Sequence, residues 1–355
     1  MTQNPPAFGI CGLSGSGKTA LIEQVIGPLR RKGLKVAVVK HAAGAIDLDR
    51  PGADSDRFFR AGADVVLEAP AEELLRTHRA GGGDPTAAPA RLAETHDLVL
   101  VEGHKGSALP KVWLLGENEA APPRDVANVA AALPPGADRA EAVLAIVDEW
   151  LTRTWLNTPV FGCALIGGTS RRMGTPKHLL RAGGRTWLER TVRLLRRACR
   201  TVVIAGAGGV PGSADPCPRI ADAPDARGPM SGILAAMRWA PHASWLVAAC
   251  DLPGLSAEAL DWLLSTRRPG VWAALPRLAG APGVEPVLAH YGFRSRRLLE
   301  QSCMRGNFRL NDLAGHPKVA SPHVPSHLAA AWQNSNAPED LKSPARSHAQ
   351  GDEDA

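Results

Sequence analysis

The sequence from Gly12 to Thr19 reads GLSGSGKT and fits the phosphate-binding pattern G-x-x-x-x-G-K-[ST] at every fixed position. An apolar strand candidate, Phe8–Leu13, precedes the motif, and a helical pattern from Lys18 to Arg31 follows it. A chance glycine turn is the alternative, but it does not account for this strand–loop–helix context. The stretch therefore predicts a P-loop in an α/β domain.

The spacing of this motif suits a bound triphosphate. Glycines let backbone N–H groups approach phosphate oxygens, and the following helix adds its positive N-terminal end. Lys18 places a point charge on the β- and γ-phosphates, and the Thr19 hydroxyl can ligate Mg²⁺. The expected nucleotide-binding residues are Gly12, Gly15, Gly17, Lys18 and Thr19.

The remainder of the first half alternates strand and helix patterns, which predicts a doubly wound, largely parallel sheet. Glu102 follows the apolar run Leu98–Val101, where P-loop proteins often place an acidic residue that orients the metal; a solvated glutamate at a strand end is the alternative. Three aspartates after the second strand could face Mg²⁺ or form turns, and both readings stay open. They are Asp47, Asp49 and Asp54. Further strands are expected at 35–40 and 111–115, a loop at 80–89 and a closing helix at 141–154.

A second glycine-rich loop begins where the pattern restarts after Asn157. An apolar strand, Val160–Ile166, runs directly into the stretch GGTSRRMGTPK, which ends at Lys177. Paired glycines let the backbone wrap a triphosphate, and basic side chains offset the charge that develops at the α-phosphorus. Arg171 either helps or is solvated. The residues of this loop expected to act are Leu165, Gly167, Gly168, Arg172 and Lys177. Arg172, Lys177 and Asp251 are the expected catalytic groups, and Asp251 is also expected to bind GTP.

Two aspartates complete this second site. Asp251 ends the apolar run 246–250, and a carboxylate there is costly unless a cation such as Mg²⁺ compensates it; a helix N-cap is the alternative. Asp222 precedes the stretch RGPMSG at 227–232, whose amides could line a nucleotide pocket. The expected helices at 187–198 and 231–239 and strands at 201–205 and 244–250 make this half a second α/β domain.

Composition agrees with a two-domain globular chain. The 355 residues are 45% hydrophobic and 21% charged, which excludes a wholly disordered chain. Residues 1–157 carry 17 basic and 20 acidic side chains, residues 158–355 carry 24 and 15, and the basic second half suggests anionic ligands. There is neither a signal-peptide core nor an apolar run near the ~20 residues of a membrane span. Six scattered cysteines fit reduced thiols, so we expect a cytoplasmic protein.

The first half resembles the MobB family, the GTP-binding adaptors of molybdopterin-guanine dinucleotide biosynthesis. Beyond the P-loop, the resemblance rests on four stretches: Lys40-His41, the segment 47–57 with its Asp, Pro-Gly and Arg pattern, Val101–Lys105, and Pro110-Lys111. The family implies a guanine nucleotide at the P-loop and slow or absent GTP turnover, while the P-loop pattern itself makes Thr19 and Glu102 the expected metal residues.

The second half resembles the MobA family, the molybdenum cofactor guanylyltransferases. The order of motifs matches: the Gly-Gly…Arg-Met-Gly…Lys loop, Asp222, the Gly-Pro-Met-Ser-Gly stretch, Cys250–Pro253, Glu285-Pro286, and a closing stretch at 334–341. The resemblance implies a Rossmann-like nucleotidyltransferase fold. It further implies GTP on Gly167, Gly168, Lys177 and Asp222, Mg²⁺ on Asp251, and Asn336 near the metal and pterin side.

Together the resemblances imply a fusion of an adaptor at 1–157 with a transferase at 158–342. The tail at 343–355 is polar and has no apolar periodicity, so we expect it to be disordered. The implied reaction moves GMP from GTP to the terminal phosphate of molybdenum-loaded molybdopterin and releases pyrophosphate. The implied partners are molybdopterin-synthesis proteins and target molybdoenzymes or their chaperones, with neither nucleic acid nor membrane; an oligomer is left open.

Two alternatives remain. Ile166 stands where the MobA family usually has alanine beside the guanine, and the stretch 205–207 lacks an asparagine that many members carry, which leaves a cytidylyl- or sugar-nucleotidyltransferase open. A regulatory P-loop protein that binds nucleic acid is the second, because the arginine-rich helix from Arg190 to Arg200 could hold polyanions. Aromatic residues are only 5%, however, so stacking platforms for bases are scarce.

Overall fold

A computed structural model of the chain describes residues 6–41, 49–78, 87–136, 138–167, 176–182, 184–211 and 217–334. The chain divides into two compact units, Met1–Leu151 and Thr152–Ala355. The division falls inside helix α4 (Arg139–Leu156), which ends one residue before the boundary expected at Asn157. Each unit is a separate α/β body.

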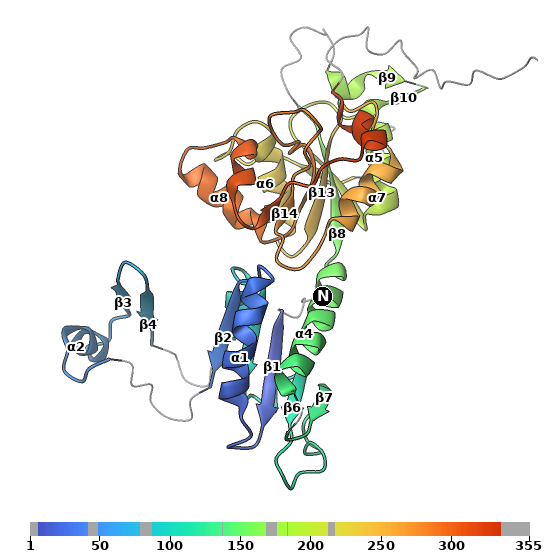
Figure 1. The fold of residues 1–355 in the computed structure, drawn as a ribbon. Helices are drawn as coiled ribbons and strands as arrows, with labels where there is room; N and C mark the ends of the chain where they lie inside the picture. The colour runs from blue at the N-terminus through green and yellow to red at the C-terminus, as the bar shows by residue number, and fades with distance from the viewer. Residues whose placement is uncertain are drawn as a thin grey trace, which may run out of the picture. The chain divides into compact units, whose positions relative to one another are not determined.

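The first unit is built on a five-stranded, wholly parallel sheet in the order β2-β5-β1-β6-β7 (Figure 1). This confirms the predicted parallel sheet and puts the strand that precedes the P-loop at its centre. The strands are β1 (Ala7–Gly12), β2 (Val36–Lys40), β5 (Leu98–Glu102), β6 (Lys111–Leu114) and β7 (Val129–Leu133). The helices are α1 (Lys18–Arg31), as expected, α3 (Ala87–Ala93) and α4.

Helices cover both faces of this sheet because its central strands are apolar on both sides. Phe8 of β1 packs its ring 5.1 Å from that of Trp150 in α4. Its neighbour Ala7 points to the opposite face, where it joins Val99 and, from α3, Leu92. The prediction of a loop at 80–89 is wrong for residues 87–89, because α3 begins at Ala87. Residues 80–86 lie outside the described residues.

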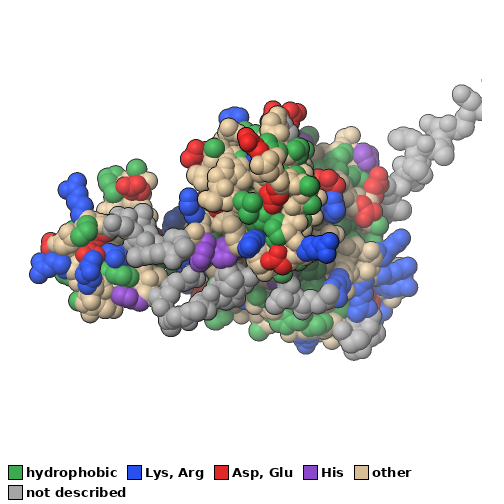
Figure 2. All heavy atoms as spheres, turned by 90° about the horizontal axis from the view of Figure 1, so that it is seen from below, with side chains coloured by type: hydrophobic (Ala, Val, Ile, Leu, Met, Phe, Trp, Pro, Cys, Tyr) green, Lys and Arg blue, Asp and Glu red, His purple; other side chains and the backbone are tan. Residues whose placement is uncertain are grey.

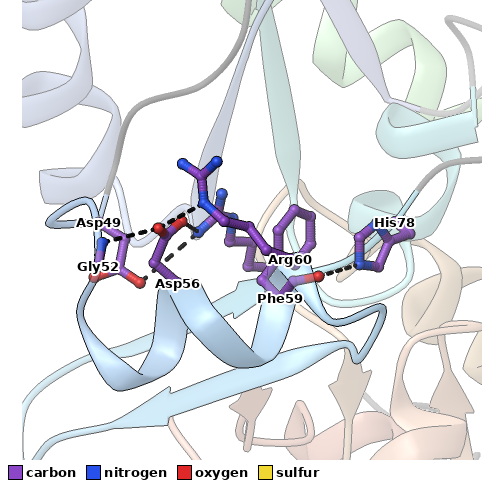
Figure 3. A network of polar contacts seen from close by, with 7 residues as sticks. Asp49, Gly52, Asp56, Phe59, Arg60 and His78 are labelled. Atoms are coloured by element: carbon purple, nitrogen blue, oxygen red, sulfur yellow. Dashed lines mark hydrogen bonds and ion pairs between the residues drawn. The ribbon is translucent and has the colours of Figure 1, made fainter.

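A small module inserted after β2 was missed by the sequence analysis. It consists of α2 (Asp54–Arg60) and the antiparallel hairpin β3 (Val65–Glu68) with β4 (Glu73–Arg76). Its centre is the buried carboxylate of Asp56, which accepts hydrogen bonds from the Gly52 amide (3.0 Å), Arg60 (2.8 Å) and Arg76 (3.1 Å). Figure 3 shows the carboxylate between the turn at Gly52 and the Arg60 side chain. The Arg76 guanidinium also lies 3.9 Å from the centre of the Phe59 ring.

Acid should open this module through Asp56. The backbone hydrogen bond from Gly52 and those from Arg60 and Arg76 lower the pKa of Asp56 from 3.8 to about 2. Because the folded-state pKa is depressed, this contribution to stability is full above pH 3.8 and is lost as the pH falls through about 2. We expect hydrogen-exchange protection of residues 49–78 to fall across that window in the wild-type protein.

In Asp56→Asn, that protection should already be reduced at pH 5, with no further step across the window. Asp54→Asn is the matched control, since the exposed Asp54 makes a weaker contact with Arg57 at 3.5 Å. Identical acid profiles for Asp56→Asn and wild type would show that this carboxylate does not hold the module together.

The second unit contains a seven-stranded mixed sheet in the order β12-β11-β8-β13-β15-β14-β16. Strands β12, β11, β8 and β13 are parallel, and β15 runs antiparallel to β13. Its strands are β8 (Val160–Leu165), β11 (Thr201–Ala205), β12 (Arg219–Ile220), β13 (Ser244–Ala249), β14 (Ala273–Ala274), β15 (Leu288–Tyr291) and β16 (Val319–Ala320), and a two-stranded ribbon pairs β9 (Arg181–Ala182) with β10 (Arg185–Thr186). The predicted α/β class is confirmed; the expected strands correspond to β8, β11 and β13, and the other strands of this unit were not predicted.

Two apolar clusters sandwich this sheet. Helices α5 and α7 lie on one face and α6 and α8 on the other (Figure 1). Trp245 of β13 belongs to the α6 side, and its neighbour Leu246 belongs to the α5 side. The helices are α5 (Trp187–Ala198), α6 (Pro229–Trp239), α7 (Ala257–Ser265) and α8 (Ser295–Met304), with 3-10 helices η1 (Lys177–Leu179), η2 (Leu310–Gly315) and η3 (Ser326–Trp332).

Two general expectations can be compared with the coordinates. All six cysteines are free thiols, as expected. Within the described ranges, no helix has the length and apolar character needed to cross a bilayer. The expected disordered tail, 343–355, lies outside the described residues.

Candidate functional sites

The P-loop lies at the carboxyl end of the central strand β1, where open α/β sheets bind ligands. A Cβ on Gly12 would lie 2.5 Å from the Ser16 hydroxyl and 2.7 Å from the Leu114 carbonyl oxygen, so only glycine fits there. Gly15 and Gly17 have positive φ angles of 79° and 88°, which other residues adopt at a cost. These three glycines therefore shape the loop that the sequence predicted.

The polar side chains expected around the P-loop converge on it. Lys18 folds back so that its ammonium donates to the carbonyl oxygens of Gly12 (3.2 Å) and Leu13 (2.7 Å). The Thr19 hydroxyl donates to Glu102 Oε1 at 3.0 Å, and Lys40 approaches the other carboxylate oxygen at 3.4 Å. The Glu102 side chain is 12% exposed, so it is not the solvated strand-end residue of the alternative reading.

The acidic cluster after β2 has structural partners. Asp49 lies 3.8 Å from Arg76, and Asp54 lies in the first turn of α2, 3.5 Å from Arg57. These contacts favour a structural role for both aspartates. Asp47 lies outside the described residues.

Two basic residues of the P-loop unit make contacts that were not predicted from the sequence. Lys111 is fully buried and donates to the carbonyl oxygens of Lys105, Ser107 and Ala127, which fixes the loop after β5; burial lowers its pKa. Arg139 opens α4 and donates to Ser16 of the P-loop at 2.9 Å. Because Ser16 and Arg139 are 123 residues apart, no local pattern in the sequence could have revealed their contact.

The second site lies at the carboxyl ends of β8 and β13. These strands are parallel neighbours, with Leu165 paired to Ala249, and the Cys250 amide donates to the Leu165 carbonyl at 3.2 Å. Gly167 and Asp251 follow directly, so the fold brings the first glycine of the predicted loop and the predicted carboxylate to the same edge of the sheet. In the sheet, β11 lies on one side of β8 and β13 lies on the other. The connections from β8 to β11 and from β11 to β13 therefore run in opposite directions across the sheet, and such a switch point is where open α/β sheets bind ligands.

Lys177 and Asp251 form an ion pair, with 3.0 Å between Lys177 Nζ and Asp251 Oδ2. Their side chains are 23% and 27% exposed, so the pair is open to a ligand. The neighbouring His178 is buried, and its Nε2 lies 2.8 Å from the Gly209 carbonyl oxygen, which anchors the segment that carries Lys177. Although 74 residues separate them in sequence, two of the three predicted catalytic side chains, Lys177 and Asp251, thus meet at one point.

Asp251 is not a helix N-cap, so that alternative is wrong. Helix α7 begins at Ala257, and its N-cap is Ser256, whose hydroxyl accepts from the Ala259 amide at 3.2 Å. The loop after Asp251 is held instead by Arg190 of α5, which donates to the carbonyl oxygens of Pro253 and Leu255. At least this arginine of the basic helix has a defined structural partner.

Asp222 lies at the start of the α6 segment, as expected. Its Oδ1 accepts a hydrogen bond from the Ser231 hydroxyl at 2.9 Å. Gly228, at the N-cap of α6, has φ 60° and ψ −149°, a conformation largely restricted to glycine. Pro229 then begins the helix, as favoured at a first position.

The segment that leads into β15 passes beside this edge. The Ala249 amide donates to the Val287 carbonyl at 2.8 Å, so the chain entering β15 runs beside the end of β13. Glu285 lies two residues before Val287, and burial raises its pKa. The Glu-Pro pair of the family pattern is therefore near the candidate site.

The donors in both sites suit Mg²⁺. A hard cation prefers carboxylate and hydroxyl oxygens, which Asp251 offers in one unit and Thr19 with Glu102 in the other. No cluster of three or more His, Cys, Asp or Glu side chains fit for a metal occurs in the described ranges, and a Mg²⁺ site with one or two protein carboxylates needs none. Gly168, Arg171, Arg172 and Asn336 lie outside the described residues.

Comparisons with known proteins agree with this two-part architecture. Residues 162–347 match the MobA-like NTP transferase domain, and residues 7–132 match molybdopterin guanine dinucleotide synthesis protein B. The probable molybdenum cofactor guanylyltransferase of Pelotomaculum thermopropionicum is 30% identical over 187 residues, which are 51% of this chain and 89% of that protein.

Two other relatives match the first half. The molybdopterin-guanine dinucleotide biosynthesis adapter protein of Haemophilus influenzae is 38% identical over 117 residues, 32% of this chain and 65% of the relative. The molybdenum cofactor biosynthesis bifunctional protein of Synechocystis is 34% identical over 115 residues, 31% of this chain and 33% of the relative. The chain thus spans less than two thirds of either relative's length. The chain belongs to the MobA-like NTP transferase family, and a domain matching molybdopterin guanine dinucleotide synthesis protein B precedes its transferase domain.

Proposed function

We propose that the second unit transfers GMP from GTP to the terminal phosphate of molybdenum-loaded molybdopterin and releases pyrophosphate. The first unit binds GTP at its P-loop and acts as the adaptor. The observation that carries the transferase assignment is the Lys177–Asp251 pair at the carboxyl ends of β8 and β13. The names of the relatives supply the guanine and the molybdenum cofactor.

The chemistry requires alignment more than proton transfer. An oxygen of the acceptor's phosphate monoester attacks the α-phosphorus of GTP, the bond from the α-phosphorus to the bridging oxygen breaks, and pyrophosphate leaves. With a second pKa near ~6, the attacking phosphate is largely ionised at neutral pH, so no general base is needed. Lys177, together with Arg172, neutralises charge on the phosphates.

Asp251 is the proposed metal ligand of the transferase, and Thr19 with Glu102 serves that role at the P-loop. Bound Mg²⁺ would neutralise phosphate charge and fix the orientation of the triphosphate. Leu165, Gly167, Gly168 and Asp222 are the residues to which we assign GTP binding in this unit, since the backbone amides of a glycine-rich loop can hold phosphates.

Partners and place in the cell belong to the same proposal. The acceptor comes from molybdopterin-synthesis proteins, and the product passes to molybdoenzymes or their chaperones. Free thiols on all six cysteines support a reducing, cytoplasmic setting.

The transferase proposal can be tested with the nucleotide as the variable. The protein, Mg²⁺ and molybdenum-loaded molybdopterin are incubated with GTP, CTP, ATP or UTP, and the products are separated and identified. We expect the guanine dinucleotide, with the other nucleotides at least tenfold poorer. A preference for CTP would establish the cytidylyltransferase alternative instead.

A nucleic-acid-binding role is the alternative from another class. On the face drawn in Figure 2, both basic and acidic side chains are exposed. Affinity for DNA that falls steeply with rising salt would revive this alternative.

A further inference from the structure

Arg139 is the first residue of α4, and its guanidinium contacts backbone from three separate segments. It donates to Ser16 of the P-loop (2.9 Å), to Leu115 just after β6 (2.5 Å), and to Leu133 and Pro134 at the end of β7 (3.1 and 2.8 Å). All four acceptors are carbonyl oxygens. A guanidinium presents its donors in a fixed planar fork, so this set of contacts defines the relative placement of the segments.

The contact with Ser16 determines how one peptide unit of the P-loop is turned. In a trans peptide the carbonyl oxygen and the following N–H point in opposite directions. Because the Ser16 oxygen is directed at Arg139, the Gly17 N–H is directed away from it. The Ser16 side chain is also confined, since its hydroxyl packs where a Cβ on Gly12 would lie, at 2.5 Å.

We propose that Arg139 is a positioning residue for the nucleotide phosphates at the P-loop. It turns the Ser16–Gly17 peptide so that the Gly17 amide can serve the phosphates, and it fixes that peptide against β6 and β7. Within the described part of the chain, its partners are carbonyl oxygens, which leave its positive charge unneutralised. That charge favours a polyanion on the loop. The inference rests on the proposed GTP binding by this unit.

A purely structural role would be to fasten α4 to the ends of β6 and β7. That role predicts a loss of thermal stability with unchanged nucleotide affinity well below the melting temperature. Positioning predicts a loss of affinity that grows with the number of phosphates. The two roles therefore differ in a measurement of GTP, GDP and GMP side by side.

The experiment uses the full-length chain and measures GTP, GDP and GMP binding by titration calorimetry. Lys18→Ala weakens the P-loop site, so the binding that differs between this variant and wild type is assigned to that site. Arg139→Gln removes the charge and most of the fork, and Arg139→Lys keeps the charge but not the fork. Arg124→Gln, a change of the same charge at an exposed position between β6 and β7, is the control.

We expect Arg139→Gln to weaken GTP binding at the P-loop about tenfold or more, since hydrogen bonds from a charged group are among the strong ones. GMP binding should change little, and Arg139→Lys should recover less than half of the loss in binding free energy. Equal GTP affinity in Arg139→Gln and wild type, or full recovery with lysine, would overturn the positioning role. Equal binding by wild type and Lys18→Ala would instead refute GTP binding at the P-loop itself.

Discussion

Asp251→Asn is expected to lower guanine dinucleotide formation roughly 10²–10⁴-fold while the protein stays folded. Asparagine keeps the shape and hydrogen-bonding capacity of the side chain but removes its charge. The variant thereby loses the proposed metal ligand and the partner of Lys177, 3.0 Å away. Initial rates of dinucleotide formation at saturating GTP measure the effect.

The control for this variant is Asp261→Asn, which removes a carboxylate from the exposed side of α7, in the helix that follows the Asp251 loop. Its rate should match that of the wild type, and circular dichroism should give the same melting curve for all three proteins. A fully active Asp251→Asn protein would show that the carboxylate has no part in the transfer.

Lys18→Ala is expected to weaken GTP binding in the first unit roughly ten- to a hundredfold, the scale of a lost charge-assisted hydrogen bond. Lys18 lies across the start of the P-loop, with its ammonium 2.7 Å from the Leu13 carbonyl oxygen, where it can turn to a bound phosphate. Dinucleotide formation should stay close to the wild-type rate because Lys177 and Asp251 belong to the other unit. Calorimetric titration with GTP and the transfer assay are run on the same preparation.

Lys32→Ala is the matched control for Lys18→Ala. Lys32 follows the same helix and pairs with Asp148 on the surface at 2.9 Å, so its loss should leave GTP binding unchanged. A fall in transfer by Lys18→Ala as large as that of Asp251→Asn would contradict a division of labour between two phosphate sites.

The sequence predicts the structure best where the signals for neighbouring elements lie within a few residues of one another. Gly12–Thr19 carries strand, turn and helix signals within a few residues, and the observed α1 begins and ends where the pattern indicates. Asp251 was also placed correctly at a strand end because the preceding run is uniformly apolar. Because β13 and β8 are parallel neighbours, the end of β13 that precedes Asp251 lies beside Leu165 at the end of β8.

The contacts that hold the sites in shape could not be predicted in this way. Arg190 reaches the carbonyl of Pro253 from 63 residues away, and His178 reaches Gly209 from 31 residues away. A side chain that bonds to a distant backbone carbonyl leaves no periodicity in the sequence, because any residue can supply the acceptor. Helix α2 and its hairpin were not predicted for a related reason. These short elements are held by hydrogen bonds to the buried Asp56 carboxylate rather than by a periodic apolar face.

The fate of the phosphates of GTP tests the central claim most directly. The full-length protein is incubated with Mg²⁺, molybdenum-loaded molybdopterin and GTP labelled at either the α- or the γ-phosphate. The account predicts that the α-label enters the dinucleotide and the γ-label appears in an equal amount of pyrophosphate. Release of the γ-label as inorganic phosphate with no α-label in a dinucleotide would mean that the chain hydrolyses GTP, and would contradict its assignment as a guanylyltransferase.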